Sequence, residues 1–153
     1  MKPSHGCVPR PAPRATTVLG LVVALSMVLL AACAPSQDPT SPGASVIQVT
    51  ERDFHISAPA EVSTGNLSLR VKNEGPDSHE FIIVRINGKL PLRADGLTVN
   101  EEALQSDNVG TLEPGEPGTV RDLRLHLTPG TYQFFCNMAG HYMAGMHGSL
   151  VVQ

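Results

Sequence analysis

The stretch DLRLHLTPGTYQFFC, residues 122–136, decides the fold class of this chain. Its first half alternates leucines with polar residues, which predicts a strand with one face in a core. Pro129 and Gly130 then mark a turn, and a second alternating run continues through Tyr132 and Phe134 to Cys136. A Tyr just after such a turn is typical of the tyrosine corner of Greek-key sandwiches.

From residue 46 onward, the rest of the chain shows the same succession of apolar runs and turn residues. Alternating or continuous apolar runs predict further strands at 46–49, 67–71, 81–84 and 150–152. The chain has 153 residues, among them 14 Gly and 13 Pro, which suits many turns and argues against a helix bundle. About seven short strands in one domain predict an all-β, Greek-key β-sandwich.

Two local features are expected within this pattern. Leu112-Glu-Pro-Gly115 is read as a second Pro–Gly turn, like the one at residues 127–130. Thr98 and Glu101 stand at the spacing of a capping box, which predicts the only helix of the domain, from Thr98 to about Gln105.

The N-terminus resembles an export signal. Residues 1–32 carry a positive head, then an uncharged apolar run, then small residues before Cys33. The sequence Leu30-Ala-Ala-Cys33 resembles the lipobox of bacterial lipoproteins, which implies a signal peptide at 1–32 and a lipidated Cys33. An uncleaved transmembrane anchor and plain secretion are the alternatives. The expected location is the extracytoplasmic or periplasmic face of the cell membrane, held by lipid.

Residues 33–45 form the expected tether, because they are rich in Pro and Ser and lack apolar periodicity. Residues 46–153 form the predicted folded domain. The chain has a formal net charge of −3 and no basic cluster in this domain, so a nucleic-acid partner is excluded.

Cys136 stands alone in the exported domain, because Cys7 lies in the signal and Cys33 is the expected lipid site. An unpaired thiol outside the cytoplasm is open to oxidation unless it is buried or coordinated. A plain buried core Cys is one explanation. Its neighbours favour another, since His141 and Met146 follow at equal spacing on one loop between two strands.

Thiolate, imidazole and thioether together suit copper, and two His, one Cys and a weak axial Met make the blue-copper arrangement. The second His must come from elsewhere in the chain. His79 is the candidate, because it follows a turn-like segment and opens the strand predicted at 81–84.

On these motifs the chain resembles a cupredoxin of the plastocyanin/azurin family, and its loop spacing is most like the rusticyanin and auracyanin type. The resemblance covers residues 46–153 and implies a Greek-key β-sandwich with one type 1 copper ion at one end. It implies His79, Cys136 and His141 as equatorial ligands and Met146 as the axial ligand. Glu80 and Ala139 stand where family members commonly have Asn and Pro.

Other side chains compete for these roles. Met143 could be the axial ligand in place of Met146, but only one residue separates it from His141. That is too short for the chain to turn and place the sulfur in the axial position. His147 is expected to point away from the site, His126 to be solvated, and His55 to have no partner nearby. Met138 and Met143 are expected to form an apolar rim around His141, where redox partners of this family dock.

The expected function is transfer of single electrons between unidentified redox protein partners by a membrane-tethered copper protein that is not an enzyme. The single Cys and the lack of His-x-His clusters argue against oxidase chemistry. The alternatives are a copper chaperone or storage lipoprotein, which would use the extra methionines, and a structural lipoprotein with an inert Cys136.

Overall fold

The computed structural model describes residues 43–153. The predicted signal peptide, Cys33 and most of the predicted tether lie outside this part of the chain. Within it, the first strand begins at Ser45 and no helix is long and apolar enough to cross a membrane. The strands are β1 (Ser45–Arg52), β2 (His55–Ser57), β3 (Glu61–Val62), β4 (Gly65–Asn73), β5 (His79–Val84), β6 (Asn108–Gly115), β7 (Val120–Leu127), β8 (Gly130–Phe135) and β9 (His147–Val152).

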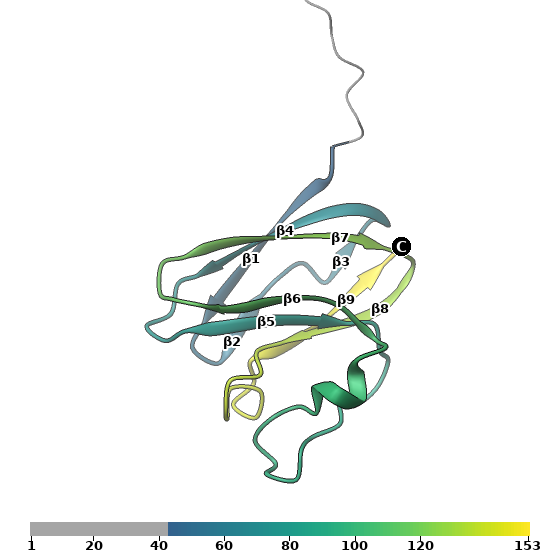
Figure 1. The fold of residues 1–153 in the computed structure, drawn as a ribbon. Coiled ribbons are helices and arrows are strands. Elements are labelled where there is room, and N and C mark those ends of the chain that lie inside the picture. Colours follow the sequence, from purple (N-terminus) through teal and green to yellow (C-terminus); the bar gives the residue numbers. More distant parts are fainter. Residues whose placement is uncertain (1–42) are drawn as a thin grey trace, which may run out of the picture. The chain divides into compact units, whose positions relative to one another are not determined.

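These strands form two sheets that face each other as the layers of a β-sandwich, as predicted (Figure 1). One sheet has the order β2-β1-β4-β7, and the other has the order β3-β9-β8-β5-β6. Most neighbours are antiparallel, but β1 pairs with β4 and β3 with β9 in parallel. The chain crosses between the sheets after β2, β3, β4, β6 and β7, which places distant segments side by side.

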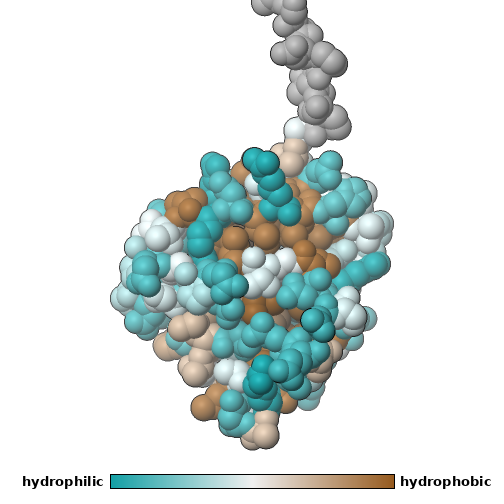
Figure 2. Space-filling model, in the orientation of Figure 1, coloured by the Kyte–Doolittle hydropathy of each residue, from teal (hydrophilic) through white to brown (hydrophobic). Residues whose placement is uncertain are grey.

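Side chains that alternate along the strands fill the space between the sheets. Leu67, Leu69 and Val71 of β4 are almost fully buried there, as their alternation with polar residues predicts. Leu123 and Leu125 of β7 are partly buried and pack against this core. Figure 2 shows apolar residues among polar ones on the surface of the molecule. The core is therefore the inter-sheet layer expected for a sandwich.

The strand β5 is buried on both faces, which explains its unbroken apolar sequence. Phe81 and Ile83 point into the inter-sheet core, whereas Ile82 and Val84 belong to a second apolar cluster. Residues 85–107, here called the covering segment, supply Leu90, Val99 and Leu104 to that cluster. The covering segment therefore packs on the outer face of this sheet.

The predicted helix was largely wrong. The covering segment forms only a 3-10 helix, η1 (Glu101–Leu104), and its N-cap is Asn100, whose side chain accepts from the Ala103 N–H. Thr98 does not cap it, because its hydroxyl contacts Asp95 at 3.1 Å. Asp95 forms a turn with its own downstream backbone and so withdraws Thr98 from the helix start.

The two Pro–Gly pairs have different outcomes. Pro129 lies in the tight connection from β7 to β8, as predicted, and the Tyr132 hydroxyl donates to the Thr128 carbonyl at 2.9 Å. This bond forms the expected tyrosine corner. The prediction of a turn at Leu112–Gly115 was wrong, because these residues end β6 and the chain turns at residues 116–119.

Candidate metal centre

Three donor atoms converge at one end of the sandwich. His79 Nδ1 lies 3.3 Å from His141 Nδ1, and Cys136 Sγ lies 3.5 Å from the same His141 nitrogen. Ligand atoms of these three residues all lie within 4.8 Å of one another, so the group can hold a metal ion. His79 and Cys136 are fully buried, and His141 is partly exposed. The structure therefore brings together the three predicted equatorial residues.

Strand pairing brings His79 close to Cys136 and His141. His79 is the first residue of β5, and Cys136 directly follows β8. These two strands are neighbours in the sheet, with Ile82 opposite Phe135. The Glu80 N–H donates to Cys136 Sγ at 3.4 Å, which ties the thiol to the start of β5. His79 therefore reaches Cys136 from a segment outside the loop that carries His141.

The ligand loop, residues 136–146, is closed by its own backbone. The Cys136 N–H donates to the Met146 carbonyl at 3.0 Å, and the Met146 N–H donates to the His141 carbonyl at 3.0 Å. Further bonds from His141 to Met138 and from Ala144 to Gly140 form consecutive turns. Such a bonded loop has few conformations to choose from, so it holds its side chains in place without a helix or strand.

The two competing methionines have opposite environments. Met146 is 0% exposed and belongs to the same apolar cluster as Cys136, whereas Met143 is 55% exposed. Met138 is partly buried against that cluster. This placement agrees with Met146 as the inner residue and Met143 as a rim residue, and the axial role of Met146 stays a prediction.

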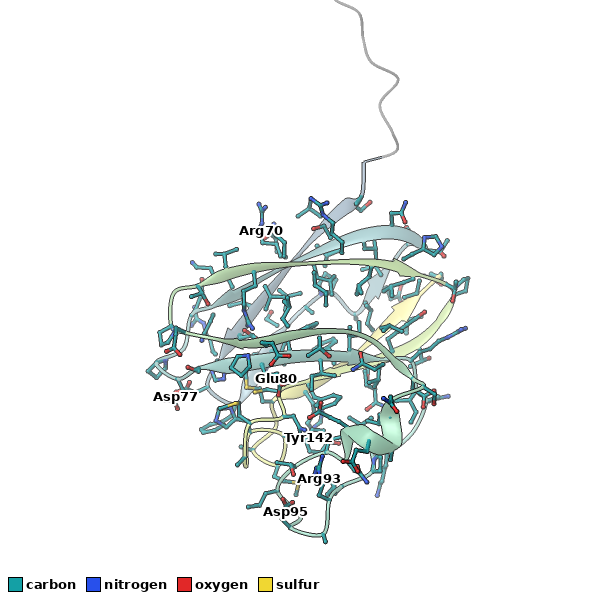
Figure 3. The ribbon with its side chains drawn as sticks, in the orientation of Figure 1. Arg70, Asp77, Glu80, Arg93, Asp95 and Tyr142 are labelled. Atoms are coloured by element: carbon teal, nitrogen blue, oxygen red, sulfur yellow. The ribbon has the colours of Figure 1, made fainter. Side chains whose placement is uncertain are left out.

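The other histidines of residues 43–153 lie apart from the three donors. His55 and His126 are exposed, and His126 Nδ1 contacts Asn66 Oδ1 at 2.9 Å. His147 is also exposed, with its ring centroid 4.7 Å from that of Tyr142. Tyr142, a residue of the ligand loop labelled in Figure 3, packs against the apolar cluster to which the covering segment contributes. None of these residues joins the group of three within the described part of the chain.

Burial controls the protonation of the donors. It lowers the pKa of His79, and the nearby His141 lowers it further, so the ring is neutral with a lone pair free near neutral pH. Burial also raises the pKa of the Cys136 thiol, although backbone N–H groups of Glu80 and Met138 oppose this. A bound cation would favour the thiolate, since a coordinated thiol loses its proton.

Three supporting residues were missed by the sequence analysis. Asn73 is buried, and its amide donates to the Asp77 and Gly115 carbonyls at 2.7 and 2.9 Å, which holds the loop before His79. Asn137 bonds to the covering segment, and Asp53 lies against His79. Asn137 and Asn73 had a signal, since Asn137 follows Cys136 and Asn73 opens the turn-like segment before His79, whereas Asp53 comes from a distant turn between β1 and β2.

No protein-family model and no curated protein sequence matches the chain. Solved structures do match it. Dithionite-reduced auracyanin from Roseiflexus castenholzii is 23% identical with a TM-score of 0.56, and the match covers 72% of this chain and 99% of that one. Auracyanin A from Chloroflexus aurantiacus, a "blue" copper protein, is 18% identical with a TM-score of 0.55, covering 72% and 100%.

Rusticyanin from Thiobacillus ferrooxidans is 18% identical with a TM-score of 0.53, and the match covers 72% of this chain and 79% of that one. At these identities the likeness concerns the fold. The chain therefore has the cupredoxin-type β-sandwich that the auracyanins and rusticyanin have.

Proposed function

We propose that this chain binds one copper ion and carries single electrons between redox proteins, without catalysing a reaction of its own. The observation that carries the proposal is the convergence of Cys136 Sγ with His79 and His141 nitrogens at the end of a sandwich. Met146, buried beside Cys136, is the proposed axial ligand. The auracyanin and rusticyanin structures support the proposal because auracyanin A, which shares the fold, is a blue copper protein.

The donor set fits copper better than the other common metals. One thiolate, two imidazoles and a weak thioether suit a blue-copper site, whereas a structural zinc site would use four strong ligands. Bound copper would supply a one-electron redox couple. The protein's part is to hold His79 and Cys136 on paired strands and His141 on a closed loop. A fixed arrangement limits the reorganisation that accompanies each change of charge.

Adding Cu(II) to the purified full chain should give an intense visible absorption with about one copper per chain. Replacing Cys136 by Ser should remove that absorption, because a hydroxyl cannot supply the sulfur-to-copper charge transfer. Replacing the exposed Met143 by Ser, a change of similar kind on the same loop, should leave it. A coloured Cys136→Ser protein would refute the type 1 assignment.

The alternative of copper handling needs several soft side chains to act together on Cu(I). In the described chain, Met146 is buried, Met143 is exposed and His147 is turned outward against Tyr142. This dispersal favours the carrier over the chaperone. A colourless protein that binds Cu(I) and transfers it to a chelator would reverse that preference.

We also propose that Cys33 is lipidated and that the domain is held at the extracytoplasmic face of the membrane. The support is the sequence of residues 1–33, with its positive head, apolar run and Leu-Ala-Ala-Cys end. Replacing Cys33 by Ala should release the chain from membranes without changing its visible spectrum. Continued membrane association of this variant would indicate an uncleaved anchor.

A further inference from the structure

Asp53 contacts His79 on the side of the ring away from the other donors. Its Oδ1 lies 3.3 Å from His79 Nε2, while His79 Nδ1 faces His141. Both atoms are buried, and neither makes a hydrogen bond of good geometry to any described residue, so their 3.3 Å contact is a close approach rather than a formed hydrogen bond. A buried polar atom without a partner is costly, and a small adjustment of the ring or the carboxylate would let each of these two atoms satisfy the other.

The backbone around Asp53 is built to allow this contact. Asp53 and Phe54 form the two-residue turn between β1 and β2, and Phe54 has a φ of 60°. A left-handed conformation costs a bulky residue free energy, and such strain gathers at functional sites. The Phe54 ring lies edge-on to the His141 ring, with centroids 5.5 Å apart. The same turn therefore touches both histidines.

The opposite wall of the contact requires a glycine. A Cβ added at Gly75 would lie 2.7 Å from Asp53 Oδ1 and 2.8 Å from His79 Nε2. The Gly75 N–H is held by Asn73 Oδ1 at 2.9 Å, so this backbone is fixed close to the pair. Three segments thus converge on one carboxylate–imidazole contact.

We propose that Asp53 is a positioning residue for the metal site: it accepts the proton of His79 Nε2, directs the Nδ1 lone pair toward Cys136 and His141, and places a negative charge behind that ligand. The inference rests on the proposed function, because it assigns a role toward the same copper ion. Metal-binding histidines commonly donate their second ring N–H to such a partner, which sets the tautomer.

The negative charge of Asp53 predicts in which direction the reduction potential should change when that charge is removed. A nearby negative charge stabilises Cu(II), which carries the larger charge, more than it stabilises Cu(I). Asp53 therefore lowers the reduction potential. Asn has the same shape and still accepts the Nε2 proton, so Asp53→Asn removes the charge and keeps the hydrogen bond.

Asp53→Asn should decrease the ratio of Cu(II) to Cu(I) affinity roughly tenfold, which raises the potential by about 59 mV in voltammetry of the full chain. Asp77→Asn is the matched control. Asp77, labelled in Figure 3, is exposed at the turn before β5 and near enough to act on the His79 charge, but within residues 43–153 it forms no ion pair with the ring. Its replacement should change the ratio less than threefold. Equal changes in the two variants would overturn the positioning role of Asp53.

Metal-free protein gives a separate readout. In the ¹⁵N NMR spectrum of the imidazole rings, His79 should have a protonated Nε2 and an unprotonated Nδ1. Asp53→Ala should remove this preference, whereas Asp53→Asn should keep it. A protonated Nδ1 in the native chain would overturn the inference. A native chain that binds no copper would end the proposed function, and these nitrogen shifts would still decide the Asp53 contact.

Discussion

Replacing Asn137 by Ala tests how the covering segment is fastened to the ligand loop. Asn137 Oδ1 accepts from the Val99 N–H at 2.6 Å, and its amide donates to the Val99 carbonyl at 3.1 Å and to Glu101 Oε1 at 2.6 Å. The Gly140 N–H also donates to the Leu97 carbonyl at 3.3 Å, but within residues 43–153 no other side chain of the ligand loop bonds to this segment. Asn137 is therefore the main side chain by which the ligand loop is bonded to the covering segment.

The expected loss follows from these three bonds. A neutral bond contributes about 1 kcal/mol net, and a bond to a carboxylate about 1.5–3 kcal/mol. Because Asn137 is only partly buried and water can replace some of these bonds, we expect the free energy of unfolding to fall by about 2–4 kcal/mol. For a domain of this size that corresponds to a decrease in Tm of roughly 10–20 °C.

Urea unfolding of the metal-free protein measures the loss, and amide hydrogen exchange locates it. The Val99 N–H, which donates to Asn137, should exchange much faster in the variant. Asn108→Ala is the control, because exposed Asn108 also makes two bonds, to the Gly110 N–H and the Thr111 hydroxyl. If Asn137→Ala costs no more than Asn108→Ala, the fastening argument is wrong.

Three further predictions concern the site and the core. Met146→Leu should raise the reduction potential of the copper-loaded chain more than Met143→Leu does, because only Met146 is buried beside Cys136. Voltammetry measures both potentials, and a larger change in Met143→Leu would make Met143 the axial ligand. Burial, with Glu101 and Glu113 nearby, raises the pKa of Glu80 to about 7. The folded metal-free chain therefore holds this proton more tightly than the unfolded chain, so stability should fall as pH rises from about 4.5 to 7. Urea midpoints at both ends of this range should show a smaller fall for Glu80→Gln, and an unchanged fall would contradict the assignment. Tyr132→Phe should lower the free energy of unfolding by about 1–2 kcal/mol in thermal unfolding, because the Thr128 carbonyl and N–H lose their partner, and no loss would deny the corner a stabilising role.

The local pattern of the sequence was enough to predict the sandwich and the ligand loop. Along residues 122–136 apolar and polar residues alternate, and successive side chains of a strand point to opposite faces. The pattern therefore predicts strands with one apolar face, whichever other strands cover that face. Cys136, His141 and Met146 lie on one short loop, so their spacing alone restricts where they can point. The helix and the Leu112–Gly115 turn failed because Asp95 and the β5–β6 pairing outweighed local propensity.

Only the tertiary structure decided what surrounds the donors. His79 is 62 residues from His141, and the pairing of β5 with β8 brings them together. Asp53 comes from the turn that joins β1 and β2 of the other sheet, and no spacing in the sequence relates it to His79. The physical reason is that a loop's ligands are limited by short-range chain geometry. Contacts between sheets instead depend on which strands pair, in which register, and how the two layers stack.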